Sequence, residues 1–356
     1  MCYRSGFRPC ATVELEDIVM NAPTKFPLAR NPVGAAPKRR PGSVRRTSTI
    51  DTAWPDGYGT PMRMDGHARD LLTPADGGAP LVLAEDRYSI VASLGREILA
   101  ISVTPDRPLA QELVGVRAVG ESRRAIGRIM ADERNRGSPL YLILDDFAGA
   151  SLVAGWAWSR WVDDTEALAE KLGLPLTGGR RGNMEGVCTG FSPGSSALDG
   201  TRPASRKDQN TARVPPLLRA DDLLGWHELG IQTGVGMRRA RRIDVWRDGD
   251  ALAIDLGFQD SSTAPDGGDR IAIHEYHVTA RAVEGRLCDL SVDVHVLPYQ
   301  ECPGAVVHAQ RMLGTPLAQL REAVLETLPG TLGCTHLNDV LRSMAEVPVM
   351  AAHLPG

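Results

Sequence analysis

The sequence repeats itself, and this internal similarity constrains the fold more than any other feature. Residues 45–51 read Arg-Arg-Thr-Ser-Thr-Ile-Asp, and residues 238–244 read Arg-Arg-Ala-Arg-Arg-Ile-Asp. Further matches follow in the same order: Asp65, Asp70, Thr73, Asp76, Gly77 and Gly78 with Asp255, Asp260, Thr263, Asp266, Gly267 and Gly268; Tyr88 and Ala92 with Tyr276 and Ala280; Leu144-Asp145-Asp146 with Leu337-Asn338-Asp339. Collinear similarity of this extent predicts two copies of one folding unit in tandem.

Composition shifts along the chain predict the boundaries of these copies. Residues 1–43 lack hydrophobic periodicity, and we expect a disordered basic tail there. Residues 175–217 are rich in glycine, proline and charge, which is typical of a linker. The first copy then spans residues 44–174, and the second spans residues 218–356.

Each copy is expected to contain four strands and two helices. The second copy has strand-like segments at residues 240–247, 250–259, 270–283 and 286–296. In the first copy, residues 121–134 and 140–158 are expected to be helical. Short connections between strands favour antiparallel pairing. The sequence therefore predicts an α+β fold, a tandem duplication of an antiparallel unit about a pseudo-two-fold axis.

Charge and hydrophobicity restrict the partners and the compartment. The formal net charge is −4, which gives no electrostatic case for binding nucleic acid. No apolar run reaches the ~18 residues that a membrane-spanning helix needs, and the first residues lack the apolar core of a signal peptide. We therefore expect a cytoplasmic protein without membrane or nucleic-acid partners, and a small molecule as its possible ligand.

The two copies differ in their reactive side chains. The second copy has cysteine and histidine where the first has residues that are less suited to nucleophilic or metal chemistry. The aligned pairs are Cys334 with Tyr141, His336 with Ile143, His274 with Asp86, and Glu275 with Arg87. This asymmetry predicts that the first copy serves as a scaffold and the second carries the site.

Three interpretations of these residues remain open. Cys302, Cys334 and His336, with His308 or His274, are suitable ligands for zinc. Alternatively, Cys334 is a nucleophile and His336 or His274 its base, because a helix beginning near Cys334 would lower the pKa of the thiol. In the third interpretation, the cysteines are ordinary core residues.

An arginine-rich run at residues 238–242 has two possible roles. Arg238 and Arg239 are candidates for binding an anionic group such as a phosphate. The alternative is a strand edge that is protected by charge. The similar run in the first copy favours the structural role.

Several of these stretches resemble a bacterial family catalogued as domain of unknown function 2889. They are Arg238-Arg239, Ile243-Asp244, His274-Glu275-Tyr276, Pro298, Cys302-Pro303 and Gly333-Cys334-Thr335-His336-Leu337. Parts of the first copy resemble longer members. The resemblance implies relatedness of fold and a place beside acyl-CoA and aromatic catabolism. We therefore expect a hydrolase or lyase that acts on an acyl or carbonyl substrate, either without a cofactor or with zinc. One alternative is a non-catalytic protein that binds a ligand or serves as a scaffold. The other is a zinc-binding protein.

Overall fold

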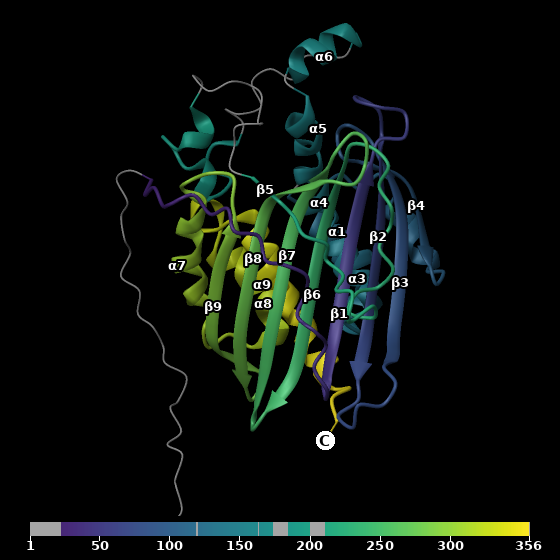
Figure 1. Ribbon diagram of the computed structural model, residues 1–356, viewed down its shortest axis with the longest axis vertical. Coiled ribbons are helices and arrows are strands. Elements are labelled where there is room, and N and C mark those ends of the chain that lie inside the picture. The colour runs from purple at the N-terminus through teal and green to yellow at the C-terminus, as the bar shows by residue number, and fades with distance from the viewer. Residues whose placement is uncertain (1–22, 119, 163, 174–183, 200–210, 356) are drawn as a thin grey trace, which may run out of the picture.

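The computed structural model describes residues 23–118, 120–162, 164–173, 184–199 and 211–355. These residues form an antiparallel sheet whose one face is covered by helices (Figure 1). The expected α+β class with antiparallel pairing is confirmed. Parts of the predicted tail and linker, residues 1–22, 174–183 and 200–210, lie outside the described residues.

The strand order is symmetrical about the centre of the sheet. Strands β1 to β4 form one meander, strands β6 to β9 form another, and β1 pairs with β6 where the two meet. The order is β4-β3-β2-β1-β6-β7-β8, and both β9 and the short β5 pair with β8. The strands are β1 (Ser43–Ala53), β2 (Met62–Thr73), β3 (Leu81–Ala92), β4 (Ile98–Thr104), β5 (Ala212–Arg213), β6 (Gly236–Asp248), β7 (Ala251–Thr263), β8 (Arg270–Val283) and β9 (Arg286–Val296).

Two glycines allow the tight connections inside the meanders. Gly77 lies between β2 and β3 with φ 76°, and Gly267 lies between β7 and β8 with φ 75°. Such positive φ angles cost glycine little but strain other residues. The Asp-Gly-Gly sequence at both places therefore forms the turns that its composition predicts.

The helices follow each meander. They are α1 (Ser122–Ile129), α2 (Ala131–Asn135), α3 (Pro139–Asp145), α4 (Phe147–Ala154), α5 (Trp156–Trp161), α6 (Thr165–Lys171), α7 (Ala305–Ala309), α8 (Leu320–Thr327), α9 (Thr335–Ser343) and α10 (Val347–Ala351). The two helices expected in the first copy are thus each broken into shorter pieces. Within the described part of the chain no single helix is long and apolar enough to cross a membrane, although the bent pair Pro139–Asp145 and Phe147–Trp161 meets that test by length and composition.

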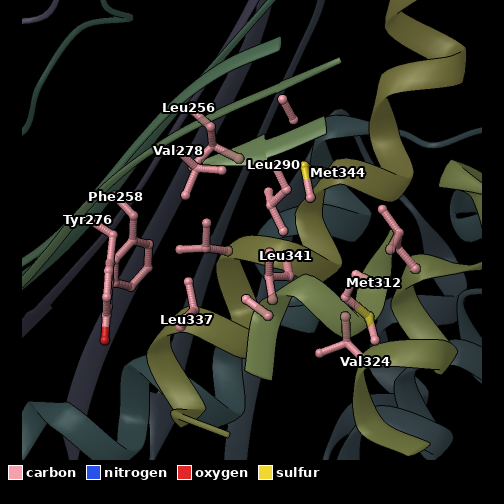
Figure 2. Close-up of a cluster of buried hydrophobic side chains, with 14 of the residues drawn as sticks. Leu256, Phe258, Tyr276, Val278, Leu290, Met312, Val324, Leu337, Leu341 and Met344 are labelled. Atoms are coloured by element: carbon pink, nitrogen blue, oxygen red, sulfur yellow. The ribbon is translucent and has the colours of Figure 1, made fainter. Parts of the chain in front are cut away.

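A hydrophobic core fills the space between the second meander and its helices. Figure 2 shows Phe258 and Val278 of the sheet, with Leu337 and Leu341 of α9 among the helical side chains of the same cluster. All four are almost completely buried. Burial of each such side chain contributes about 1.5–3 kcal/mol, so this core anchors α9 on the sheet.

Salt bridges join the two meanders across the β1–β6 pair. The Arg45 side chain meets Asp244, and the Arg238 side chain meets Asp51, each at 2.6 Å. Both arginines donate two hydrogen bonds to their carboxylate. The antiparallel register places Arg45 opposite Asp244 and Arg238 opposite Asp51, so the two salt bridges are related by the symmetry of the strand pair.

A β-bulge occurs at the same place in both meanders and corrects part of the expected alignment. The register shifts directly after Asp70 in β2 and after Asp260 in β7. Asp70 pairs with Ala84, and Asp260 pairs with His274. His274 therefore corresponds in position to Ala84, not to Asp86. The expected matches of Glu275 with Arg87, Tyr276 with Tyr88 and Ala280 with Ala92 are displaced by the same two residues, so each residue of β8 corresponds to a position in β3 two residues earlier than expected.

The N-terminal segment from residue 23 to 42 crosses the face of the sheet opposite to the helices (Figure 1). It is held there by hydrogen bonds from Asn31 N to His295 O (2.9 Å) and from Val33 N to the Glu275 carboxylate (2.7 Å). The Arg39–Asp222 salt bridge at 2.6 Å fixes its end. The prediction of disorder is thus wrong for this part of the tail.

We expect the Arg238→Met substitution to destabilise the protein by about 3 kcal/mol, because it leaves Asp51, whose side chain is 14% exposed, without its counter-charge. Chemical denaturation would measure this loss. The matched control is Arg281→Met in the exposed salt bridge with Asp248, where the side chains are 48% and 53% accessible. That control should cost less than about 1 kcal/mol. Equal losses for the two variants would contradict a stabilising role for the buried pair.

Candidate functional site

Three potential metal ligands converge where β7, β8 and α9 meet. Asp260 lies in β7, His274 is its partner in β8, and His336 lies in the first turn of α9. The Asp260 Oδ2 atom is 3.7 Å from His274 Nδ1 and 3.6 Å from His336 Nε2. One ligand atom from each residue lies within 4.8 Å of the others. The pairing of β7 with β8 and the packing of α9 on this sheet thus assemble the group.

His274 is buried, 12% of the His336 side chain is exposed, and the two rings stack with centroids 3.4 Å apart and an interplanar angle of 16°. Burial lowers the pKa of His336 to about 4, although Asp260 acts in the opposite direction. The imidazole is therefore neutral at pH 7. A neutral imidazole has the free lone pair that metal binding requires.

Asp260 is held in position by Arg239. The guanidinium donates from Nε to Oδ1 (2.9 Å) and from Nη2 to Oδ2 (3.0 Å), and a further nitrogen reaches Asp339 (2.8 Å). Burial alone would lower the pKa of Arg239, but Asp260 and Asp339 raise it above the ordinary value. The arginine thus stays charged and fixes the carboxylate that faces the histidines.

Cys334 lies beside the histidines at the start of α9, as expected. Its sulfur accepts a hydrogen bond from Tyr276 OH (3.3 Å) and lies 3.8 Å from His336 Nδ1. The expected lowering of the thiol pKa is wrong, however, because burial raises the pKa of Cys334 and outweighs the hydrogen bonds from Tyr276 and the backbone. A buried, protonated thiol is a poor nucleophile.

A cavity of about 30 Å³ adjoins these residues. Its walls include Trp156 of α5, Tyr299 and Phe191. Residues 187–191, which belong to the predicted linker, thus form part of the site. The cavity has room for a water molecule but not for a metabolite, so a larger ligand requires movement of its walls.

Gly190 brings this segment close to Cys302. A Cβ atom at residue 190 would lie 2.6 Å from the Cys302 sulfur, which only glycine avoids. Cys188 is buried beside them, and burial raises its pKa to about 12. Cys302 is buried too, and burial raises its pKa. These thiols therefore pack as apolar groups around the cavity.

The structure brings together only part of the predicted zinc site. His336 belongs to the metal-capable group, and Cys302 and Cys334 line the neighbouring cavity. In the part of the chain that is described, the group with suitable geometry also includes His274, the predicted alternative to His308, and has Asp260 in place of the two cysteines. His308 lies in α7, outside this group. An aspartate occurs at this position in both halves, as Asp70 and Asp260, so a search for residues that differ between the halves does not find it.

The arginine run lies in β6, a central strand, so the interpretation as a protected strand edge is wrong. Arg238 and Arg239 point to opposite faces of the sheet, and both are buried. Each donates two hydrogen bonds to a carboxylate of the protein, Asp51 or Asp260. Binding of an external anion would have to compete with these internal partners.

The comparisons with known proteins concern the part of the chain that contains this site. Residues 237–350 match the family described as "Protein of unknown function (DUF2889)". The resemblance found in the sequence is thereby confirmed for this segment. The DUF2889 segment contains β6 to β9 and α7 to α9, and hence Asp260, His274 and His336. No curated protein and no solved structure matches the chain significantly.

The lowered pKa of His336, which lies in the DUF2889 segment, predicts that the protein loses stability in acid. Its pKa is about 4 in the folded protein and 6.5 ordinarily, so between these pH values only the unfolded chain is protonated. Stability therefore falls as the pH drops from 6.5 to 4, by on the order of 3 kcal/mol from this group. Denaturation at several pH values should show a smaller fall for His336→Asn than for the wild type. The exposed control His353→Asn should behave as the wild type does.

Alkylation tests the state of Cys334. Iodoacetamide at neutral pH should modify Cys334 at least about tenfold more slowly than a free thiol, because the side chain is buried and protonated. Peptide mass spectrometry would locate the modified cysteine, and unfolded protein provides the control for full reactivity. Modification of folded Cys334 at the rate of a free thiol or faster would restore the nucleophile hypothesis.

Proposed function

We propose that this protein is a metal-dependent enzyme of small-molecule metabolism, a hydrolase or lyase, whose metal is bound by Asp260, His274 and His336. The observation that carries the proposal is the convergence of these three side chains. Two imidazoles and one carboxylate are suitable ligands for zinc or iron(II) and leave positions for water or substrate.

The distances within the group support this proposal. Ligand atoms bound at ~2.1 Å in a tetrahedral arrangement lie roughly 3.4 Å apart. The Asp260 oxygen lies 3.6–3.7 Å from a nitrogen of each histidine, so small movements are sufficient on these two sides. The stacked histidine rings would have to rotate so that both lone pairs point to one ion.

The surrounding residues would orient the ligands. Arg239 fixes Asp260, and Cys334 faces Nδ1 of His336 while the opposite ring nitrogen faces Asp260. Such contacts commonly set the orientation of metal-binding histidines. In this proposal Cys334 is a positioning residue instead of the nucleophile.

A bound divalent metal would supply a Lewis acid that polarises a carbonyl group or activates water. The aromatic and thiol-lined cavity favours an uncharged acyl or carbonyl group over a charged one, because Trp156, Phe191 and Cys302 offer it no counter-charge. The small size of the cavity favours a second candidate, a protein in which the metal has a structural role.

We also infer that the chain arose by tandem duplication, with copies at residues 44–174 and 218–356. The symmetrical β1–β6 register, the bulges after Asp70 and Asp260, and the repeated salt bridges support this origin. The cytoplasm remains the expected compartment.

Metal titration tests the proposed centre. Cobalt(II) or zinc should bind the wild type with one ion per chain, and His274→Ala or His336→Ala should weaken binding by more than about tenfold. Cobalt absorption spectra and isothermal titration calorimetry would measure both the ligand set and the affinity. The matched control is His308→Ala in α7, which should bind as the wild type does. Less than about a tenth of an equivalent of metal in the wild type would exclude the centre.

An activity assay separates the two candidate functions. A panel of small esters, thioesters and hydratable carbonyl compounds should reveal turnover that is lost on chelation and restored by metal. If the metal binds but chelation lowers only the melting temperature, the structural role is favoured.

A further inference from the structure

The N-terminal segment that crosses the sheet is anchored on both sides of a less tightly packed middle part. Asn31 N donates to His295 O of β9 (2.9 Å), and the salt bridge of Arg39 with Asp222 (2.6 Å) holds the other side. The middle part, residues 32–38, lies over a cavity of about 60 Å³ between the segment and the sheet. A cavity of this size has room for water. The middle part can therefore move while its two anchors stay in place.

Glu275 of β8 connects the middle part to the sheet. Its carboxylate accepts a hydrogen bond from Val33 N (2.7 Å) and another from the Gln259 side chain of β7. Glu275 is 4% exposed, and it lies beneath the segment among the residues that line the cavity. Both donors are uncharged, so a buried carboxylate here has hydrogen bonds but no counter-charge to offset its removal from water.

The charged groups of the neighbouring strands are engaged with other partners. Arg242 of β6 lines the same cavity, but its guanidinium donates to Asp244 and Asp255. His277, two residues after Glu275 in β8, lies between Asp255 (2.9 Å) and Asp293 of β9 (3.6 Å). These carboxylates satisfy the arginine and the histidine, so neither cation neutralises Glu275.

Further titratable groups lie on the segment and on the end of β9. The backbone of Arg30 pairs with Val296, the β9 partner of Glu275, and His295 Nδ1 lies 2.9 Å from the Asn31 oxygen. The Lys38 side chain is exposed to water. The influences on the pKa of Glu275 are burial, the Val33 N–H and Gln259; burial dominates and raises it to about 7.

The sign of the pH effect follows from the two states of the segment. While residues 32–38 cover Glu275, the carboxyl group keeps its proton up to about pH 7, whereas an exposed glutamate loses it near 4.5. Between these pH values only the covered state is protonated. Covering is therefore strongest in acid, weakens as the pH rises from 4.5 to 7, and gains nothing from this proton at higher pH.

We propose that residues 32–38 form a pH-dependent cover on the face of the sheet opposite to the helices, closed while Glu275 is protonated and open once it is ionised. The ionised carboxylate needs water, which enters at the cavity and separates the cover from the sheet. The anchors at Asn31 and Arg39 keep the open cover attached. This inference is independent of the proposed metal centre, because Glu275 and His274 point to opposite faces of β8.

Hydrogen exchange of the Val33 amide, measured by NMR relative to its intrinsic rate at each pH, tests the proposal. Protection of this amide in the wild type should fall by roughly tenfold to hundredfold between pH 5 and pH 8. Glu275→Gln keeps an acceptor for Val33 N but has no charge, so protection should stay high at both pH values. The control Glu326→Gln changes an exposed carboxylate and should behave as the wild type does. The amide of Phe26, bonded to Gln300 O (2.9 Å), should keep constant protection.

A second variant separates Glu275 from the histidine beside it. His277→Asn should retain the pH dependence of Val33 protection, because His277 is bound to Asp255 and not to the cover. Three results would overturn the proposal. The first is protection in the wild type that is constant or rises from pH 5 to pH 8. The second is a pH dependence that persists in Glu275→Gln, and the third is one that disappears in His277→Asn.

Discussion

The fold depends on buried arginines that are matched by carboxylates at the centre of the sheet. Arg45 and Arg238 pair across the β1–β6 contact with Asp244 and Asp51. On the other face, Arg239 holds Asp260, which belongs to the candidate metal centre. Removing a guanidinium from water is expensive, so each one requires a counter-charge in a fixed place. The need of buried arginines for counter-charges therefore both joins the two meanders and positions Asp260 in the candidate metal centre.

Hydrogen bonds from these arginines also hold other segments against the face of the sheet that lies opposite the helices. Arg45 donates to the backbone oxygens of Pro37 and Gly225, and Arg238 donates to that of Gly230. The segments that supply these oxygens complete the hydrogen bonds that the carboxylates leave open, since each guanidinium has five donors. His227 is fixed on the same face between Thr47 (2.8 Å) and Thr49 (2.9 Å). The N-terminal and central connecting segments are consequently part of the folded structure.

The two meanders share one framework but offer different chemistry. Asp70 and Asp260 follow the same strand register, yet the residue opposite is Ala84 in one case and His274 in the other. In the second meander, imidazole and thiol groups line a cavity of about 30 Å³. In the first, carboxylates and arginines line a larger one of about 330 Å³. The two meanders thus share a strand register and differ in the residues placed at one equivalent position.

The sequence by itself determined the α+β class, the antiparallel pairing of neighbouring strands and the enrichment of histidine and cysteine in the second half. These properties follow from local patterns and from self-similarity, which need no knowledge of distant contacts. Only the tertiary structure decided that Asp260 joins His274 and His336, that the Cys334 thiol has a raised pKa, and that His274 corresponds to Ala84. The grouping of Asp260 with the two histidines and the raised pKa of Cys334 depend on burial by segments distant in the sequence, such as α9 and residues 187–191. The correspondence of His274 with Ala84 depends on a β-bulge. Desolvation and strand register arise only when the whole sheet is assembled, so no local pattern specifies them.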